Sequence, residues 1–276
     1  MKTRNSGRLV CTILAGLAIG CAQQPQQPPT LDVATTTSVQ NSGLLDALLP
    51  HFDVATVRMH AAGSGRALEM LQDGIVDLVI SHAPEAEARY LAAHQDWSYQ
   101  KLAFNRFVLV GPPTDPAGVK TTTNVLDAFR RIAQSSVDFV SRGDASGTHE
   151  REQMLWKQAG AVPSAGRLLV SGQGMSITLR HAHEKRAYTL TDEATFWQLQ
   201  RQVDLVVVSE GDALLLNTYA VIHPRDAETA ARFSEWLTRG EGRQRIGDHR
   251  IEGRAAFQPW PEGCAGRTPD ALPCGT

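Results

Sequence analysis

From residue 31 onward, short apolar runs alternate with segments whose apolar residues recur at helical spacing. Short apolar runs bounded by turn residues are typical of buried strands, and spacings of three and four residues are typical of amphipathic helices. The expected strands are 31–34, 56–60, 75–81, 104–111, 137–141, 168–171, 203–209 and 219–223. The expected helices lie near 44–52, 66–72, 124–134, 154–156, 176–185 and 192–201. This alternation predicts an α/β fold, with helices flanking a mostly parallel sheet.

Two of the expected strands, 104–111 and 219–223, resemble each other, and both end in turns that contain proline. We interpret them as paired crossings between two lobes. One lobe then comprises residues 31–114 plus 218–258, the other comprises 115–217, and 259–276 form a C-terminal tail. Because ligands of α/β proteins commonly bind in a crevice at the ends of strands, this organisation predicts a ligand cleft between the lobes.

Residues 1–20 have the pattern of a secretory signal, in which basic residues precede an apolar stretch too short to span a bilayer. The sequence Leu-Ala-Ile-Gly-Cys, which ends at Cys21, resembles a lipobox, after which a bacterial lipoprotein is cut and its cysteine acylated. Ordinary secretory cleavage near Cys21 is the alternative. Both interpretations export the protein to the periplasm or cell envelope. Residues 21–30 are polar and rich in proline, which predicts a flexible tether.

Composition narrows the class of function. The chain is 42% hydrophobic and 20% charged, which is typical of a globular protein with a core. Its formal net charge is −2, and loss of residues 1–20 removes three basic residues and no acidic one, which leaves −5. No basic run is interleaved with aromatic residues, so the sequence disfavours a nucleic-acid binder.

The four cysteines fall into separate roles. Cys11 leaves with the signal and Cys21 is the lipid site, so Cys264 and Cys274 remain. In an oxidising compartment we expect these two to form a disulfide. A metal or redox pair is the alternative, but neither a CxxC spacing nor a nearby histidine cluster supports it.

Four loops each follow a strand, are rich in Ser, Thr and Gly, and open a helix; they are residues 35–38, 63–65, 142–148 and 171–176. A helix start offers unpaired N–H donors and a partial positive charge, and Ser or Thr adds a hydroxyl donor. Together the loops predict an anion site. Any one of them alone is explained by ordinary helix capping, because Ser and Thr are preferred caps.

The third loop adds a charge to this pattern. Arg142 stands two residues before Asp144, which can hold the guanidinium in place beside the helix start. A guanidinium is a planar fork that matches tetrahedral oxyanions. A solvated loop arginine is the alternative interpretation.

Three motifs resemble one known family over nearly the whole mature chain. They are Thr-Thr-Thr-Ser at 35–38 followed by Ser-Gly-Leu-Leu at 42–45, Ser-Arg-Gly-Asp-Ala-Ser-Gly-Thr-His at 141–149, and Tyr-Thr-Leu-Thr-Asp at 188–192 with Ala-Thr at 194–195. This set resembles the tungstate-binding proteins of bacterial tungstate ABC transporters. These are type II periplasmic binding proteins, in which two α/β lobes close on a ligand. The middle motif also resembles phosphate-binding proteins.

The resemblance implies a set of ligand residues. Thr36, Thr37 and Ser38 contact the oxyanion, and Arg142 and Thr148 contact it from the other lobe. Ser64 and Ser176 are assigned mainly from their places at helix starts. The tail, residues 259–276, departs from the family pattern and is expected not to touch the ligand.

The resemblance also implies the partners. The ligand is tungstate, with molybdate as an alternative, and neither a cofactor nor a metal site is expected. An ABC transporter permease receives the ligand, a lipid anchor holds the protein at the membrane, and we expect a monomer.

Two other functions remain open to test. A phosphate-binding protein on the same scaffold would use a carboxylate such as Asp144 to accept the proton of hydrogen phosphate, whereas tungstate needs only donors. A hydrolase would use Ser146, His149 and Asp144. Three residues so close at a helix start point in different directions, and no G-x-S-x-G elbow is present, so we expect no enzyme activity.

Overall fold

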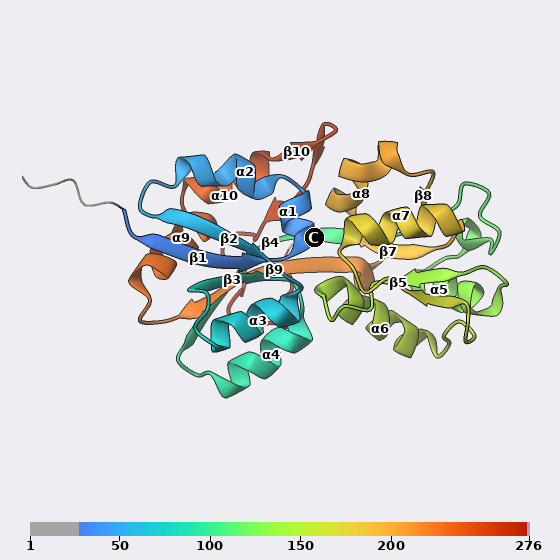
Figure 1. Cartoon of the computed structure of the whole chain (residues 1–276), viewed down its shortest axis with the longest axis horizontal. Coiled ribbons are helices and arrows are strands. Elements are labelled where there is room, and N and C mark those ends of the chain that lie inside the picture. Colours follow the sequence, from blue (N-terminus) through green and yellow to red (C-terminus); the bar gives the residue numbers. More distant parts are fainter. Residues whose placement is uncertain (1–27, 275–276) are drawn as a thin grey trace, which may run out of the picture.

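The computed structural model describes residues 28–274. The predicted signal segment, Cys21 and residues 22–27 of the tether lie outside the described residues. Two α/β lobes stand side by side and are joined by two long strands that run through both (Figure 1). The predicted α/β class is confirmed. None of the helices within residues 28–274 combines the length and apolar character needed to cross a membrane.

The first lobe is built from both ends of the described chain. Its strands are β1 (Thr30–Thr35), β2 (Thr56–Ala61) and β3 (Leu78–Ser81), with the short β10 (Arg250–Ile251), β11 (Arg254–Ala255) and β12 (Gln258–Pro259). Its helices are α1 (Thr37–Asn41), α2 (Leu44–Leu48), α3 (Ser64–Gln72), α4 (Pro84–Ala93), α9 (Glu228–Thr238) and α10 (Glu241–Asp248), with the 3₁₀ turn η1 (Leu49–His51). The helices cover both faces of the sheet (Figure 1).

The second lobe is built from the middle of the chain. Its strands are β5 (Phe139–Ser141), β6 (Leu168–Val170), β7 (Thr189–Asp192) and β8 (Val206–Ser209). Its helices are α5 (Val125–Gln134), α6 (Gly147–Ala159), α7 (Met175–Lys185) and α8 (Glu193–Leu199), with the 3₁₀ turns η2 (Val119–Thr121), η3 (Gln200–Gln202) and η4 (Ala213–Leu215).

The lobes are connected by β4 (Trp97–Gly111) and β9 (Leu216–Pro224), which pair antiparallel with each other. In the first lobe the strand order is β12-β4-β9-β3-β1-β2, with β1 parallel to both β2 and β3. In the second lobe, β7 and β8 pair with the far end of β4, while β5 and β6 form a parallel pair. The chain passes twice between lobes along adjacent strands, as expected for a two-lobed binding fold.

Each lobe has its own hydrophobic core. Leu31, Ile80 and Phe233 are buried in the first lobe, and Phe107, Phe129 and Tyr188 are buried in the second. Leu109 and Val110 near the end of β4 also pack in the second lobe. The residue limits of the lobes, 31–114 plus 218–258 and 115–217, stay a prediction.

Helix α5 illustrates why the sequence pattern was informative. Val125, Ala128, Phe129 and Ile132 recur at spacings of three and four and are all fully buried. Asn124 caps the helix, because its side chain accepts the N–H of Asp127 at 2.9 Å. Apolar spacing and a cap therefore specify the same helix.

Some elements were not anticipated. Strand β4 begins at Trp97, seven residues before the expected start, because its first half alternates buried and half-buried positions instead of forming an apolar run. Helices α4, α9 and α10 carry short or interrupted apolar faces. The expected loop 142–148 is shorter than predicted, since α6 already begins at Gly147.

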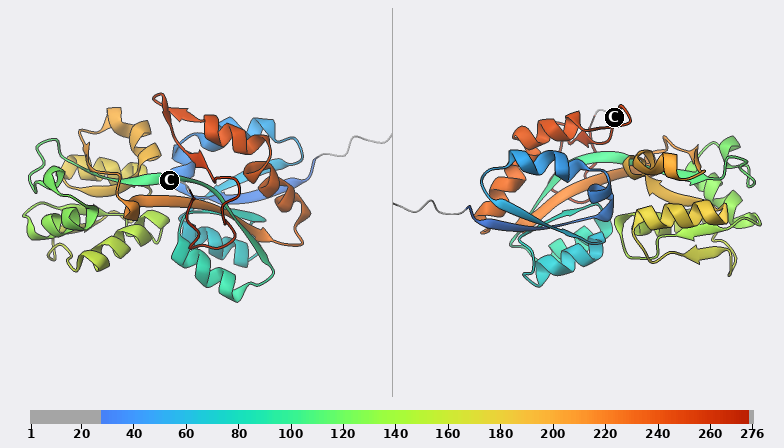
Figure 2. Two further views of the ribbon diagram at one scale, coloured as in Figure 1. Left: turned by 180° about the vertical axis from the view of Figure 1, so that it is seen from behind. Right: turned by 45° about the horizontal axis from the view of Figure 1, so that its top comes forward.

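The C-terminal tail folds back across the first lobe (Figure 2). The backbone N–H of Lys101 on β4 donates to the carbonyl oxygen of Gly266 at 2.6 Å, and Trp260 Nε1 donates to that of Ala265 at 3.0 Å. Cys264 and Cys274 form a disulfide, with their Cα atoms 5.7 Å apart. The tail is thus a fixed part of the first lobe.

A buried carboxyl group, Glu152 on α6, holds the end of β5. Its Oε2 accepts the backbone N–H of Arg142 at 3.2 Å, and the side chain is almost inaccessible to water. Burial raises the pKa of Glu152 from 4.5 to about 7. Glu193 at the start of α8 has a pKa that burial likewise raises to about 7.

These carboxyl groups predict that stability falls with rising pH. A carboxyl whose pKa is higher in the folded than in the unfolded chain stabilises the fold below the unfolded value, and this contribution is lost as pH rises through the folded value. Glu152→Gln should reduce the fall in unfolding free energy between pH 5 and pH 8 by roughly 2–3 kcal/mol. Urea unfolding at both pH values measures this. A fall in unfolding free energy as large as that of the wild type would contradict the prediction. Glu193 accounts for part of the pH dependence that remains in Glu152→Gln.

Candidate functional site

The four predicted loops meet where the lobes face each other. Two come from the first lobe, at the starts of α1 and α3, and two from the second lobe, at the starts of α6 and α7. A Cβ built on Gly63 would lie 3.4 Å from the carbonyl oxygen of Asp144, and one on Gly174 would lie 3.6 Å from Thr37 Oγ1. The loops are therefore within van der Waals reach across the junction.

The first lobe presents hydroxyl groups. Thr36 caps α1 by accepting the N–H of Val39 at 3.3 Å, which leaves its own hydroxyl proton free to donate. Thr37 is partly buried and Ser38 is fully buried in the first turn of α1. Ser64 is buried at the start of α3 and accepts the N–H of His82 at 3.3 Å. Each of these acceptor roles leaves a donor available.

The second lobe presents a buried guanidinium. The side chain of Arg142 is 2% exposed, and its Nη2 is paired with the carboxylate of Asp144. The other oxygen of Asp144 accepts the N–H of Ser146 at 3.2 Å, so the carboxylate is engaged on both sides. Within residues 28–274, Arg142 Nε and Nη1 have no hydrogen-bond partner. A buried cation with two unused donors is suited to hold an anion.

Two hydroxyls of the second lobe lie in the first turns of α6 and α7. Thr148 Oγ1, in the first turn of α6, is buried and has no hydrogen-bond partner among the described residues. Ser176 Oγ, at the start of α7, accepts from Asn41 Nδ2 of the first lobe at 2.8 Å. Asn41 thereby fixes the Ser176 hydroxyl across the junction and leaves its proton free.

Three further residues were not singled out as ligand residues from the sequence. Thr35 Oγ1, Thr195 Oγ1 and Asp192 Oδ2 are buried and unpartnered in the part of the chain that the structure describes. Asp192 caps α8, since its other oxygen accepts the N–H of Thr195 at 2.9 Å. Helix α8 packs against α1 and α7. The available sequence signals were the motifs at 35–38 and 188–195, although the resemblance assigned no ligand role to these three residues.

His82 lies at the junction, where burial disfavours the charged form of its ring. Its ring stacks on Tyr219 with centroids 5.1 Å apart, and its Nδ1 is 2.9 Å from Asn217 Oδ1. Burial lowers the pKa of His82, and the nearby charges include Asp192 and Arg142. Its backbone oxygen lies so close to Gly147 of the other lobe that an added Cβ there would collide with it.

The alternative hydrolase triad is not assembled. Ser146 Oγ caps α6 by accepting the N–H of His149 at 3.3 Å, while His149 Nδ1 accepts the N–H of Ala145 at 3.1 Å. Asp144 is paired with Arg142. The three side chains therefore stabilise the loop and the start of α6 instead of forming a triad. Within residues 28–274, no group of three His, Cys, Asp or Glu side chains is arranged to hold a metal ion.

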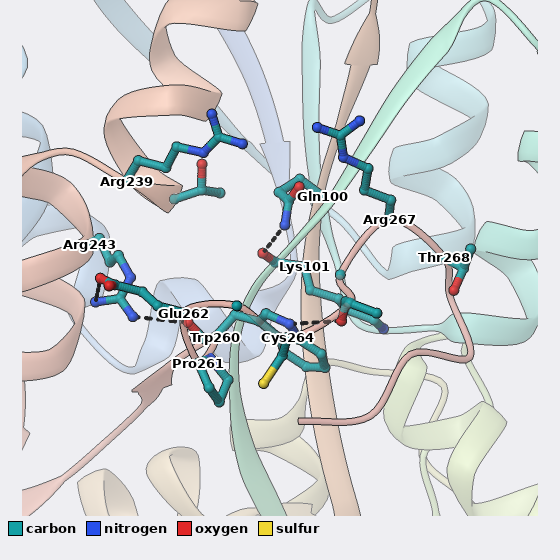
Figure 3. Close-up of a pocket in the computed structure, with 14 residues that line it drawn as sticks. Gln100, Lys101, Arg239, Arg243, Trp260, Pro261, Glu262, Cys264, Arg267 and Thr268 are labelled. Atoms are coloured by element: carbon teal, nitrogen blue, oxygen red, sulfur yellow. Dashed lines mark hydrogen bonds and ion pairs between the residues drawn. The ribbon is translucent and has the colours of Figure 1, made fainter. Parts of the chain in front are cut away.

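A cavity of about 640 Å³ lies elsewhere, between β4, the ends of α9 and α10, and the tail (Figure 3). Arg243 donates to the carbonyl oxygen of Trp260 at 3.0 Å and lies 3.6 Å from Glu262. These contacts hold the tail against the first lobe. The residues lining this cavity include none of the predicted ligand residues.

The chain resembles known proteins over most of its length. Residues 23–241 match the model of the PBP superfamily domain. The chain is 34% identical to the tungstate-binding protein TupA of Peptoclostridium acidaminophilum, over 87% of this chain and 89% of that protein.

Two solved structures are also similar. One is described as the tungstate ABC transporter from Geobacter sulfurreducens, with 36% identity, 79% of this chain and 98% of that chain covered, and a TM-score of 0.72. The other is the tungstate-binding protein TupA from Desulfovibrio alaskensis, with 37% identity, 84% and 98% covered, and a TM-score of 0.71. The predicted resemblance and the two-lobed fold are confirmed. This chain belongs to the PBP superfamily, in the same family as the tungstate-binding protein TupA.

Proposed function

We propose that this protein is the substrate-binding component of an ABC importer, which captures tungstate in the periplasm and delivers it to a membrane permease. The observation that carries the proposal is the guanidinium of Arg142, buried at the lobe junction with Nε and Nη1 unpartnered among the described residues. The relatives named above support tungstate as the ligand. The protein binds and releases its ligand and is not an enzyme.

The proposed ligand residues come from both lobes. Hydroxyl donors and the cation act together, because tungstate is a dianion that accepts hydrogen bonds and donates none. The set comprises Thr36, Thr37, Ser38 and Ser64 from the first lobe and Arg142, Thr148 and Ser176 from the second. To these we add Thr35 and Thr195, whose buried hydroxyls lack a partner within residues 28–274. Because the ligand contacts both lobes, its binding favours the arrangement in which the lobes are close together over the one in which they are apart.

Phosphate is the competitor to be excluded. Hydrogen phosphate needs a buried acceptor for its proton, and both oxygens of Asp144 are already engaged. Asp192 Oδ2 is a buried oxygen without a partner among the described residues, so it could serve that role. A direct comparison of oxyanions therefore decides the ligand.

We also propose the finer features of the mature protein. Cys21 carries the lipid that anchors it at the membrane, residues 21–30 act as a tether, and the protein is a monomer. The lobe limits follow the two passes of the chain along β4 and β9. Support for the anchor comes from the lipobox-like sequence that ends at Cys21.

The first test is an oxyanion panel, titrated by calorimetry. We expect tungstate to bind most tightly, molybdate less tightly, and phosphate and sulfate weakly. Longer metal–oxygen bonds suit donors fixed on both lobes, whereas a smaller ion leaves some unpaired, and each unpaired buried donor costs about 1–3 kcal/mol. Phosphate that displaces tungstate at comparable concentration would promote the phosphate-binding alternative.

The second test removes the buried cation. Arg142→Ala should weaken tungstate binding by at least about tenfold, because a hydrogen bond to a charged group contributes about 1.5–3 kcal/mol. Arg142→Lys should bind at an intermediate level, since it keeps the charge but loses the fork. Arg180→Ala, an exposed arginine on α7, is the matched control. Wild-type affinity in a folded Arg142→Ala protein would exclude Arg142 from the site.

The third test blocks the close approach of the lobes. The methyl group of Gly147→Ala would collide with the backbone oxygen of His82, which belongs to the other lobe. Overpacking of this kind costs about 1–3 kcal/mol, so affinity should fall roughly fivefold to 150-fold. The melting temperature without ligand should change little. Gly63→Ala is the control, because its Cβ would make only an ordinary contact of 3.4 Å with Asp144. Equal affinities of the two variants would contradict the argument.

The fourth test concerns processing. Intact mass of the protein purified from membranes should correspond to a chain that starts at Cys21 with lipid attached. Substitution of Cys21 by Ser should release the protein from the membrane fraction. A free N-terminus at another residue in the wild type would rule out the anchor.

A further inference from the structure

The first turn of α4 is capped by a residue of the other lobe. Ala83 occupies the N-cap position and has no side-chain oxygen to offer. Glu150 on α6 supplies both acceptors instead. Its Oε1 accepts the N–H of Glu85 at 2.9 Å, and its Oε2 accepts the N–H of Ala86 at 3.0 Å. The carboxylate therefore satisfies two backbone donors that a helix start otherwise leaves unpaired.

This contact is mechanically linked to the proposed ligand site. Thr148 and Glu150 lie in the same first turn of α6, so a movement that brings one toward the first lobe also brings the other. On the first-lobe side, α4 follows His82, whose backbone N–H is bonded to Ser64. Each partner of the contact is therefore two to four residues from a residue at the junction, without itself belonging to the proposed ligand set.

The contact exists only while the lobes are together. Burial raises the pKa of Glu150, so its carboxylate is partly withdrawn from water, and the two N–H groups and the positive end of α4 compensate. When the lobes separate, the carboxylate and both N–H groups return to water. The bonds thus add to the stability of the closed arrangement and leave the separate lobes unaffected.

We propose that Glu150 is a positioning residue that latches the lobes over the bound oxyanion and lengthens its residence time. The inference rests on the proposed function, because it needs an oxyanion held at the lobe junction. A second contact, Asn41 to Ser176 at 2.8 Å, joins the lobes through α1 and α7. That contact involves a proposed ligand residue, whereas the hydrogen bonds of the Glu150 carboxylate go to the backbone N–H groups of Glu85 and Ala86.

The experiment compares Glu150→Gln with Glu184→Gln, which removes the same charge from an exposed position on α7. Glutamine keeps one acceptor and turns an amide N–H₂ toward the second backbone donor. Stopped-flow exchange of sodium tungstate should show dissociation on the order of tenfold faster in Glu150→Gln, with little change in association. The melting temperature without ligand should match that of the wild type, and Glu184→Gln should match it in every measurement. Glu150→Ala is a second variant and should also release tungstate faster.

The outcomes separate the two proposals. A folded Glu150→Gln that releases tungstate at the wild-type rate overturns the latch, and so does a loss of ligand-free stability without a change in dissociation. Wild-type protein that gives no heat with sodium tungstate refutes the proposed ligand instead. In that case, the same exchange measurement with sodium molybdate or sodium phosphate, whichever gives heat, decides the latch, and an unchanged dissociation rate in Glu150→Gln overturns it.

Discussion

A guanidinium that is buried and permanently charged must be compensated, and the junction of this protein is arranged around that requirement. Arg142 has one nitrogen paired with Asp144, while its remaining buried donors have no partner within residues 28–274. A single carboxylate satisfies one edge of the fork. Under the proposed function, the other edge binds the oxyanion, because leaving buried charged donors unpaired is costly.

The loop that carries Arg142 is fixed by its own backbone. Gly143 has a φ of 62°, and a Cβ there would collide with Val170. Ala145 has a φ of 55°, a conformation in which residues other than glycine are strained. Glu152 accepts the N–H of Arg142, and Asp144 accepts that of Ser146. These contacts fix the orientation of the guanidinium, and a fixed orientation lowers the entropic cost of the oxyanion binding that we propose.

The sequence predicted those elements whose residues follow a local pattern. The spacing of Val125, Ala128, Phe129 and Ile132 defined α5, and the Ser/Thr/Gly loops marked the helix starts that meet at the junction. The first half of β4 was missed because its outward positions are only half-buried, so no apolar run marks it. Asp192 and Thr195 lie in a motif that carries the resemblance, but a buried side-chain atom without a partner can be recognised only in three dimensions.

Contacts between the lobes are the hardest feature to predict from the sequence. Each residue in such a contact also fits an ordinary role in its own helix or loop. Ala83 is a poor N-cap, and nothing near it in the sequence announces that Glu150, 67 positions later, caps its helix. Such contacts must also be limited in strength. A binding protein whose lobes closed firmly without ligand would exclude its own substrate, so the ligand has to supply the difference between open and closed forms. The raised pKa of Glu150 reflects a desolvation cost that offsets part of its hydrogen bonding. The latch can then favour closure once Arg142 is compensated, and the separated lobes remain accessible before that.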